Sequence, residues 1–182
     1  MAGVDEVGRG SFAGPMVIGL VVYNEWLGKV RGLNDSKLLS PAKREALFKK
    51  IIANCEYGIG MCWPHEIDKD GISKGLQMCV DRAFDCIESP DYLFVDGRVK
   101  LELPFEHETM VKGDMRVRCI AAGSIIAKVF RDQMMKEYCK LIFGYDLRNH
   151  VGYGTVSHRR RIKQLGPSRI HRRTFLRNTL NA

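Results

Sequence analysis

The sequence lacks an apolar run long enough to cross a membrane. A membrane span needs about 18–20 consecutive apolar residues, whereas Asp5, Glu6 and Arg9 interrupt the first apolar segment within ten residues of Met1. Nothing near this end resembles a secretory signal, which needs an uninterrupted apolar region. We therefore expect a soluble, cytoplasmic protein that makes no membrane contact.

Cysteine pairs with the spacing of zinc ligands are also missing. The six cysteines, at positions 55, 62, 79, 86, 119 and 139, form no CxxC pair and lie mostly inside apolar stretches. Disulfide frameworks are typical of small secreted chains. We expect reduced core thiols instead.

Acidic residues are absent from the end of the chain. After Asp146 there are nine Lys and Arg residues and no Asp or Glu. Without these nine, 20 basic residues nearly balance the 21 acidic ones, so the net charge of +8 comes from this end. Such a segment is typical of proteins that meet a polyanion, although a solvated basic tail has the same composition.

The length of 182 residues, with 45% apolar residues, suffices for one domain with a sizeable core. No repeats, low-complexity stretches or linkers divide the chain. We expect a single domain over 1–182. It would have an α/β core over 1–145 and a basic C-terminal segment over 146–182 that is not an independent domain.

Apolar runs rich in β-branched residues predict the strands. The run from Gly14 to Tyr23 is typical of a central strand covered on both faces. A strand over 1–7 precedes it, and shorter strands are predicted at 56–63, 92–95 and 108–112.

Helical signals alternate with these strands. Ser40-Pro41 has the pattern of an N-cap followed by proline in the first turn, which predicts a helix to about Cys55. Apolar residues recur at helical spacing over 73–88 and over 120–143. Strands followed by helices place the chain in the α/β class.

Four acidic residues share one placement in this pattern. Asp5, Glu6, Asp96 and Asp114 each lie at the end of a predicted strand, beside a turn that contains glycine. Strand ends are where an α/β sheet gathers distant side chains, and clustered carboxylates repel one another unless a cation binds. Mg²⁺ prefers oxygen ligands, and two ions about 3.5–4 Å apart suit phosphoryl transfer.

The spacing of these acids leaves alternatives open. An acid at a strand end is often a solvated turn residue. Asp5 and Glu6 are also adjacent, and consecutive side chains of a regular strand point to opposite faces. They can share a pocket if the strand ends or distorts there, which Gly8 and Gly10 permit.

An ordered series of motifs surrounds the acids. These are Asp5-Glu6-Val7-Gly8-Arg9-Gly10, Ala13-Gly14-Pro15, Asn34-Asp35-Ser36-Lys37, Val95-Asp96-Gly97, Lys112-Gly113-Asp114, Ser124-Ile125-Ile126-Ala127-Lys128-Val129 with Arg131-Asp132, Gly152-Tyr153-Gly154-Thr155, Gly166-Pro167-Ser168 and Ile170-His171-Arg172-Arg173-Thr174-Phe175. In this order, across residues 3 to 175, they resemble the signature of the ribonuclease HII family.

The resemblance implies a ribonuclease H-like mixed sheet flanked by helices. It implies an endonuclease that hydrolyses RNA paired with DNA and cleaves 5′ to ribonucleotides embedded in duplex DNA, leaving a 5′-phosphate and a 3′-hydroxyl. The catalytic and metal-binding carboxylates of the family map onto Asp5, Glu6, Asp96 and Asp114. Two Mg²⁺ or Mn²⁺ ions per site are implied, with Asp5 bridging them.

The resemblance also implies how the substrate is read. In the family, the tripeptide matching Gly8, Arg9 and Gly10 recognises the 2′-hydroxyl at an RNA–DNA junction, together with the tyrosine matching Tyr153. A 2′-hydroxyl both donates and accepts hydrogen bonds and distinguishes RNA from DNA. A tyrosine ring can stack on a sugar or base.

Several basic residues are predicted to contact phosphates. They are Lys37 and the run Arg159, Arg160 and Arg161, with His158 beside the run as a further contact to the nucleic-acid backbone. A surface lysine and a solvated helix face are the alternatives for these residues.

Two positions depart from the family pattern. Ser11-Phe12 stands where many relatives have proline and a smaller apolar residue, and Gly123 stands where alanine is usual. Both lie beside motifs, so they bear on local rigidity rather than on the acids.

Two other functions are weighed against this one. A non-catalytic module could bind RNA–DNA hybrids, although four intact acids argue against it, and a type 1 ribonuclease H would need several consecutive ribonucleotides. We expect a monomer whose partner is nucleic acid, either a hybrid or a DNA duplex with embedded ribonucleotides. No feature of the sequence identifies a sliding-clamp partner or the preferred metal.

Overall fold

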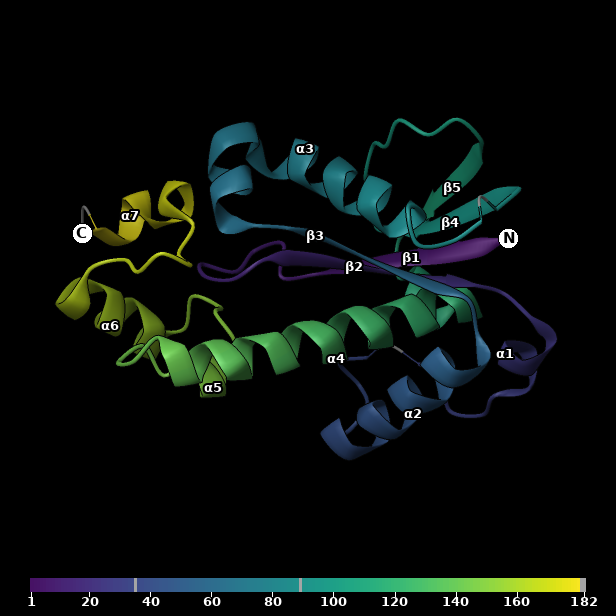
Figure 1. Cartoon of the computed structure of the whole chain (residues 1–182), viewed down its shortest axis with the longest axis horizontal. Coiled ribbons are helices and arrows are strands. Elements are labelled where there is room, and N and C mark those ends of the chain that lie inside the picture. Colours follow the sequence, from purple (N-terminus) through teal and green to yellow (C-terminus); the bar gives the residue numbers. More distant parts are fainter. Residues whose placement is uncertain (35, 89, 181–182) are drawn as a thin grey trace.

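The computed structural model describes residues 1–34, 36–88 and 90–180, arranged around one mixed sheet (Figure 1). The sheet has five strands in the order β3-β2-β1-β4-β5. The strands are β1 (Ala2–Val7), β2 (Met16–Val22), β3 (Tyr57–Cys62), β4 (Tyr92–Asp96) and β5 (Glu106–Met110). The helices are α1 (Glu25–Lys29), α2 (Pro41–Asn54), α3 (Pro64–Phe84), η1 (Gly113–Met115), α4 (Arg118–Leu141), α5 (Leu147–His150), α6 (Val156–Leu165), η2 (Arg173–Leu176) and α7 (Arg177–Leu180).

The pairing of β1 with its two neighbours differs in length. All six residues of β1 pair antiparallel with β2, whereas the parallel ladder with β4 ends at Val4 opposite Val95. Asp5 and Glu6 therefore lie beyond the last β1–β4 pair. The sheet opens there, on the side of β1 that faces the end of β4.

Helices cover both faces of the sheet. In Figure 1, α3 lies along one face, α4 lies along the other, and α2 packs outside α4. The backbones of α4 and β2 touch: a Cβ at Gly123 would lie 2.5 Å from the carbonyl oxygen of Gly19, and a Cβ at Gly19 would lie 2.2 Å from that of Gly123. Gly123, a departure from the family pattern, is therefore required by this close packing.

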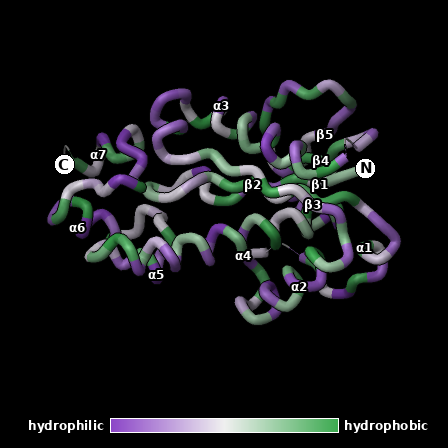
Figure 2. Tube along the Cα trace, in the orientation of Figure 1, coloured by the Kyte–Doolittle hydropathy of each residue, from purple (hydrophilic) through white to green (hydrophobic). Residues whose placement is uncertain are grey.

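The apolar core lies in two layers against the sheet. One layer joins β1, β2 and β4 to α3, and the other joins β2 to α2 and α4. Figure 2 shows the central strands mostly in the hydrophobic colour, with hydrophilic segments recurring in the outer helices. All six cysteines are free thiols, and four of them are buried, which confirms the prediction of reduced thiols.

Most predicted elements of the core are confirmed. β1, β2, β3 and β4 match the strands expected at 1–7, 14–23, 56–63 and 92–95, and α2 begins directly after the expected cap. The Ser40 side chain accepts a hydrogen bond from the Lys43 backbone N–H. The α/β class with a mixed, helix-flanked sheet is confirmed.

Two predicted boundaries are wrong. The helix expected at 73–88 begins at Pro64, and its first part is separated by a kink at Gly71, where φ is +83°. β5 lies at 106–110 rather than 108–112, because Lys112 adopts a left-handed turn conformation with φ of 57°.

The segment after residue 145 folds back onto the start of the chain. His171 forms an isolated β-bridge with Ala13, and the N–H of Arg172 donates to the Phe12 carbonyl at 2.8 Å. A third apolar cluster joins Ala13 to Met135 and to Ile162 of α6.

Among the described residues, no helix is both long and apolar enough to span a membrane.

Candidate active site

Asp5 and Glu6 lie on a regular part of β1. The strand neither ends nor distorts at these residues, because both pair with β2 and β1 continues to Val7. Asp5 is 7% exposed and hydrogen-bonds Ser124 of α4, while Glu6 is half-buried. Both carboxylates nevertheless lie close enough to Asp96 for its charge to raise their pKa values.

Asp96 and Asp114 are joined through Gly113. Asp96 ends β4, and its Oδ1 accepts a hydrogen bond from the Gly113 N–H at 2.6 Å. A Cβ at Gly113 would lie 2.6 Å from Ile120, so glycine allows this close approach. Asp114 is the next residue and is 7% exposed. We call Asp5, Glu6, Asp96 and Asp114 the carboxylate edge.

Negative charge is concentrated at the carboxylate edge. Burial and the charges of Glu6 and Asp96 raise the pKa of Asp5 to about 7, against a lowering by the Ser124 hydrogen bond. Burial and Asp96 also raise the pKa of Glu6, while Arg9 and Lys37 oppose the rise. A positive ligand would stabilise all of these carboxylates.

The donor set fits a hard divalent cation, because it offers only carboxylate oxygens. In the described parts of the chain, no three His, Cys, Asp or Glu side chains already surround one point as metal ligands. Neighbouring carboxylates repel one another, and a bound cation would replace this repulsion with attraction. The assignment of all four acids as ligands is therefore carried forward as a proposal.

Gly8, Arg9 and Gly10, which we call the junction loop, follow β1 directly. Gly8 has φ of +81°, and its backbone N–H donates to the Tyr153 hydroxyl at 3.2 Å. Arg9 and Gly10 are exposed, and Arg9 lies 3.7 Å from Glu6. The structure thus brings together the loop and the tyrosine that the sequence paired across 145 positions.

Lys37 lies close enough to the carboxylate edge to lower the pKa of Glu6. Its neighbour Ser36 is buried, and the Ser36 and Ser124 hydroxyl groups are hydrogen-bonded at 2.8 Å, while Ser124 also bonds Asp5. The segment around Lys37 is thereby held beside Asp5. Asp35, which belongs to the same motif, lies outside the described residues.

The run Arg159, Arg160 and Arg161 lies on α6, and all three side chains are exposed. They differ in what they contact. Arg159 donates to the Gly154 carbonyl at 3.0 Å and lies 5.4 Å from the Phe12 ring centre, whereas Arg161 donates to Gln164 on its own helix, at 3.5 Å. Arg159 is thus engaged in the fold as well as accessible.

The predicted contact of His158 with nucleic acid is wrong, because its side chain is fully buried. Its Nδ1 is 3.0 Å from the Tyr153 carbonyl and its Nε2 is 3.1 Å from His171 Nε2. Arg172, counted in the basic surplus, is also 0% exposed. Neither side chain is available to a polyanion at the surface.

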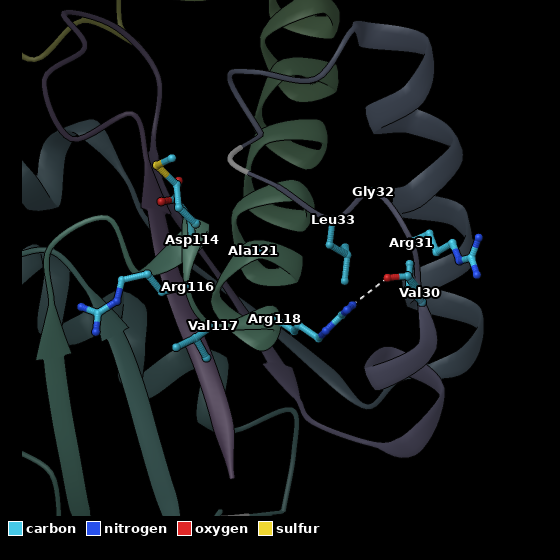
Figure 3. Close-up of a pocket in the computed structure, with 10 residues that line it drawn as sticks. Val30, Arg31, Gly32, Leu33, Asp114, Arg116, Val117, Arg118 and Ala121 are labelled. Atoms are coloured by element: carbon cyan, nitrogen blue, oxygen red, sulfur yellow. Dashed lines mark hydrogen bonds between the residues drawn. The ribbon is translucent and has the colours of Figure 1, made fainter.

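A pocket of about 400 Å³ opens beside Asp114, between residues 30–33 and the start of α4 (Figure 3). Arg118 reaches across it and donates to the Val30 carbonyl at 2.6 Å. Arg31 and Arg116 lie on opposite sides of the pocket and point away from it. The sequence analysis did not single out these arginines, because they are scattered among acids of the near-neutral body.

The fold and the carboxylate edge together define the class. The mixed sheet carries acids on β1, at the end of β4 and in η1. A glycine-rich loop and basic residues lie next to these acids. This combination defines a nuclease with a ribonuclease H-like fold. Comparison with known proteins identifies the family within this class.

Residues 2–178 match the family described as Ribonuclease HII. A ribonuclease HII of Thermotoga petrophila is 42% identical over 176 residues, covering 96% of this chain and 72% of that protein. Among solved structures, the ribonuclease H2 of Pyrococcus horikoshii is similar with a TM-score of 0.77 and 28% identity, over 99% of this chain and 96% of that one. The ribonuclease HII in a complex with PCNA from Archaeoglobus fulgidus is similar with a TM-score of 0.81 and 25% identity, over 100% and 96%.

The chain belongs to the ribonuclease HII family, as the resemblance in sequence implied. It is an endoribonuclease of ribonuclease H type 2, with ribonuclease H activity on RNA paired with DNA. Enzymes of this class depend on a metal ion.

Proposed function

We propose that the chain cleaves the RNA strand of RNA–DNA hybrids and cuts 5′ to ribonucleotides embedded in duplex DNA. Each cut leaves a 3′-hydroxyl and a 5′-phosphate. The observation that carries this proposal is the bond between the Gly8 N–H and the Tyr153 hydroxyl, at 3.2 Å. It joins a loop suited to the 2′-hydroxyl with a ring suited to the adjoining deoxyribose, immediately after the strand that bears Asp5 and Glu6.

The four residues of the carboxylate edge would hold two divalent ions, Mg²⁺ or Mn²⁺, with Asp5 shared between them. Such ions, when bound, activate the attacking water and stabilise the leaving oxygen. Ser124 orients Asp5 through its hydrogen bond, and the Gly113 N–H orients Asp96. Lys37 and Arg9 lie beside Glu6 and supply positive charge for the substrate phosphates.

Exposed arginines extend this positive surface. Arg159, Arg160 and Arg161 on α6 would contact duplex phosphates away from the cut. We further propose that the enzyme works as a cytoplasmic monomer and that residues 1–182 form one domain. The PCNA partner belongs to the relative from A. fulgidus, and we propose no clamp partner for this chain.

Two duplexes test the proposal. One carries a single ribonucleotide in DNA, and the other carries a strand of RNA paired with DNA. The chain should cut both with Mg²⁺ or Mn²⁺ and neither when the metal is chelated. Cleavage of the hybrid alone would show a type 1 specificity, and binding of both without cleavage would show a non-catalytic module.

A further inference from the structure

Two arginine side chains lie completely buried behind the junction loop. Arg131 of α4 and Arg172 of the C-terminal segment are both 0% exposed. Charged side chains are almost never fully buried unless they are paired. The partners of these two guanidinium groups therefore need an explanation.

Main-chain carbonyls, with one hydroxyl, surround both groups. Arg131 donates to the carbonyls of Pro15 at 2.8 Å, Val151 at 2.9 Å and Ala13 at 3.1 Å, and to the Ser11 hydroxyl at 2.9 Å. Arg172 donates through two nitrogens to the Gly14 carbonyl, at 3.1 and 2.9 Å, and to the Arg9 carbonyl at 2.8 Å. Both guanidinium groups thus donate hydrogen bonds to neutral carbonyl and hydroxyl groups.

Within the described residues, neither guanidinium group forms an ion pair with a carboxylate. Burial lowers the pKa of both, that of Arg172 to about 10, with a further lowering by the charge of Arg131. Burying charges without opposite charges is costly, so the fixed carbonyls are what stabilises both guanidinium groups.

The bonds of Arg131 all reach segments that carry the junction loop or Tyr153. The Ser11 hydroxyl, which Arg131 contacts, donates to the Gly8 carbonyl at 2.8 Å. Val151, which immediately precedes Gly152 and Tyr153, is held by Arg131 in a left-handed conformation, with φ of 43°, that is strained for a β-branched residue. A Cβ at Gly8 would lie 2.2 Å from Nε of Arg131.

Arg131 also faces the recognition tyrosine directly. Its guanidinium carbon lies 5.3 Å from the centre of the Tyr153 ring, within the range of a cation–π contact. Ser11, a departure from the family pattern, thus replaces the rigidity of proline with hydrogen bonds to Gly8 and Arg131. The buried guanidinium group of Arg131 therefore supports both the junction loop and Tyr153.

We propose that Arg131 and Arg172 are positioning residues for junction recognition. Arg131 fixes Tyr153 relative to the junction loop, and Arg172 fixes the carbonyl side of that loop. The inference rests on the proposed function, since it concerns how the same site tells a single ribonucleotide from a continuous hybrid.

The forked shape of the guanidinium group and its charge can be tested separately. Lysine keeps the charge but cannot donate to several carbonyls in one plane, and methionine removes both. The first readout is the ratio of kcat/KM on a single-ribonucleotide duplex to that on an RNA–DNA hybrid. The second is the log–log slope of duplex affinity against salt, measured without divalent metal.

Arg131→Lys should lower the selectivity ratio at least about fivefold while leaving the salt slope unchanged. Arg172→Lys and Arg172→Met should also lower the ratio, because neither side chain can donate to the carbonyls of Arg9 and Gly14 together. Both should keep the wild-type slope, because Arg172 is 0% exposed and contacts no phosphate. Ser11→Ala, which removes only the hydroxyl, should lower the ratio about two- to threefold. Arg82→Met is the matched control, because Arg82 bonds the Met61 carbonyl and Glu66 away from the loop. Arg82→Met should change the melting temperature but neither readout.

Unchanged ratios in both Arg131→Lys and Ser11→Ala would overturn the positioning role. An unchanged ratio in Arg172→Lys, or a reduced slope in either Arg172 variant, would overturn the positioning role of Arg172. If the methionine variant fails to fold, the lysine and alanine variants still decide the positioning role. Failure of the wild-type chain to cut the single-ribonucleotide duplex would instead overturn the proposed function itself.

Discussion

The carboxylate edge and the arginine-supported junction loop adjoin along β1, yet each accommodates like charges in a different way. At the edge, burial and mutual repulsion raise the pKa of Asp5 to about 7, and the positive ligand has to come from solution. Behind the loop, Arg131 and Arg172 are buried among fixed carbonyls of their own chain. On the proposed function, a metal completes the first region, whereas the second is built before substrate arrives. Changes at the edge should therefore affect chemistry, and changes behind the loop should affect selectivity.

The largest effect is expected from Asp5→Asn. The variant should lose cleavage, because Asp5 is the proposed shared ligand, yet it should fold and bind substrate. Without metal at pH 8, its free energy of unfolding should rise by about 1–3 kcal/mol, since one repelling charge is removed. Cleavage assays and urea unfolding check the two halves of this prediction.

Asp91→Asn is the control for Asp5→Asn, because Asp91 is an exposed acid before β4. It should change neither activity nor stability. Turnover of Asp5→Asn within about tenfold of wild type would contradict the two-metal assignment.

The next largest effect is expected from changes at Tyr153, which contacts the junction loop. Tyr153→Ala should lose about 1–3 kcal/mol of stacking, which corresponds to a rate loss of roughly one to two orders of magnitude on a single embedded ribonucleotide. The loss on an all-RNA strand paired with DNA should be smaller. Tyr153→Phe keeps the ring but loses the bond to Gly8, so its loss should be intermediate.

The alternative for Tyr153 is a packing role alone. Equal losses of Tyr153→Ala on both substrates, or a melting temperature lowered by many degrees, would support that alternative. Steady-state kinetics on the two duplexes and a thermal melt are sufficient to distinguish the cases.

The buried histidines predict how stability depends on pH. Burial lowers the pKa of His158 and of His171 to about 4, from an ordinary value of 6.5. At these two histidines the unfolded chain therefore binds more protons than the folded one between pH 6.5 and 4. Their contribution to stability is fully present above pH 6.5 and falls as the pH drops through this window, by roughly 2–4 kcal/mol in all. The raised pKa of Asp5 acts in the opposite direction over this window, so the histidine contribution is read from the difference between wild type and a histidine variant.

Urea unfolding of wild type and His171→Gln at pH 8, 6 and 5 measures this dependence. The variant should be less stable at pH 8 but should lose less stability on acidification. Parallel pH profiles for the two proteins would show that His171 does not contribute to the effect.

The smallest effect is expected from the surface arginines. Replacing Arg159, Arg160 and Arg161 with alanine should reduce the log–log salt slope by roughly 0.7–0.9 for each phosphate that the variant no longer neutralises. The weakening should be similar for hybrid and DNA duplex, because phosphate contacts carry no sequence information. An unchanged slope would identify the run as a solvated helix face.

The elements around the carboxylate edge could be predicted from sequence because their signals are local. The apolar run of β2 and the Ser40-Pro41 start of α2 each report their own structure. The first part of α3 was missed because polar residues such as His65, Glu66 and Asp68 dilute its periodicity, and Gly71 interrupts it. Its start is fixed instead by a hydrogen bond from the Trp63 N–H to the Glu66 side chain, at 2.7 Å.

The support behind the junction loop could not be predicted, because it depends on contacts between distant segments. Arg172 stands between His171 and Arg173 in a basic stretch and has the sequence signal of a surface residue. Only the fold shows that its partners are the carbonyls of Arg9 and Gly14, more than 150 positions earlier. His158 was assigned to the surface for the same reason.

The most direct test of the account is to map the cut in a DNA duplex that contains one ribonucleotide, with Mg²⁺ and with the metal chelated. If the carboxylate edge holds the proposed cations and the junction loop reads one 2′-hydroxyl, as we propose, wild type should cut only with metal. The cut should lie on the 5′ side of the ribonucleotide and leave a 3′-hydroxyl and a 5′-phosphate. Metal-independent cleavage, or a cut placed without regard to the ribonucleotide, would contradict the account.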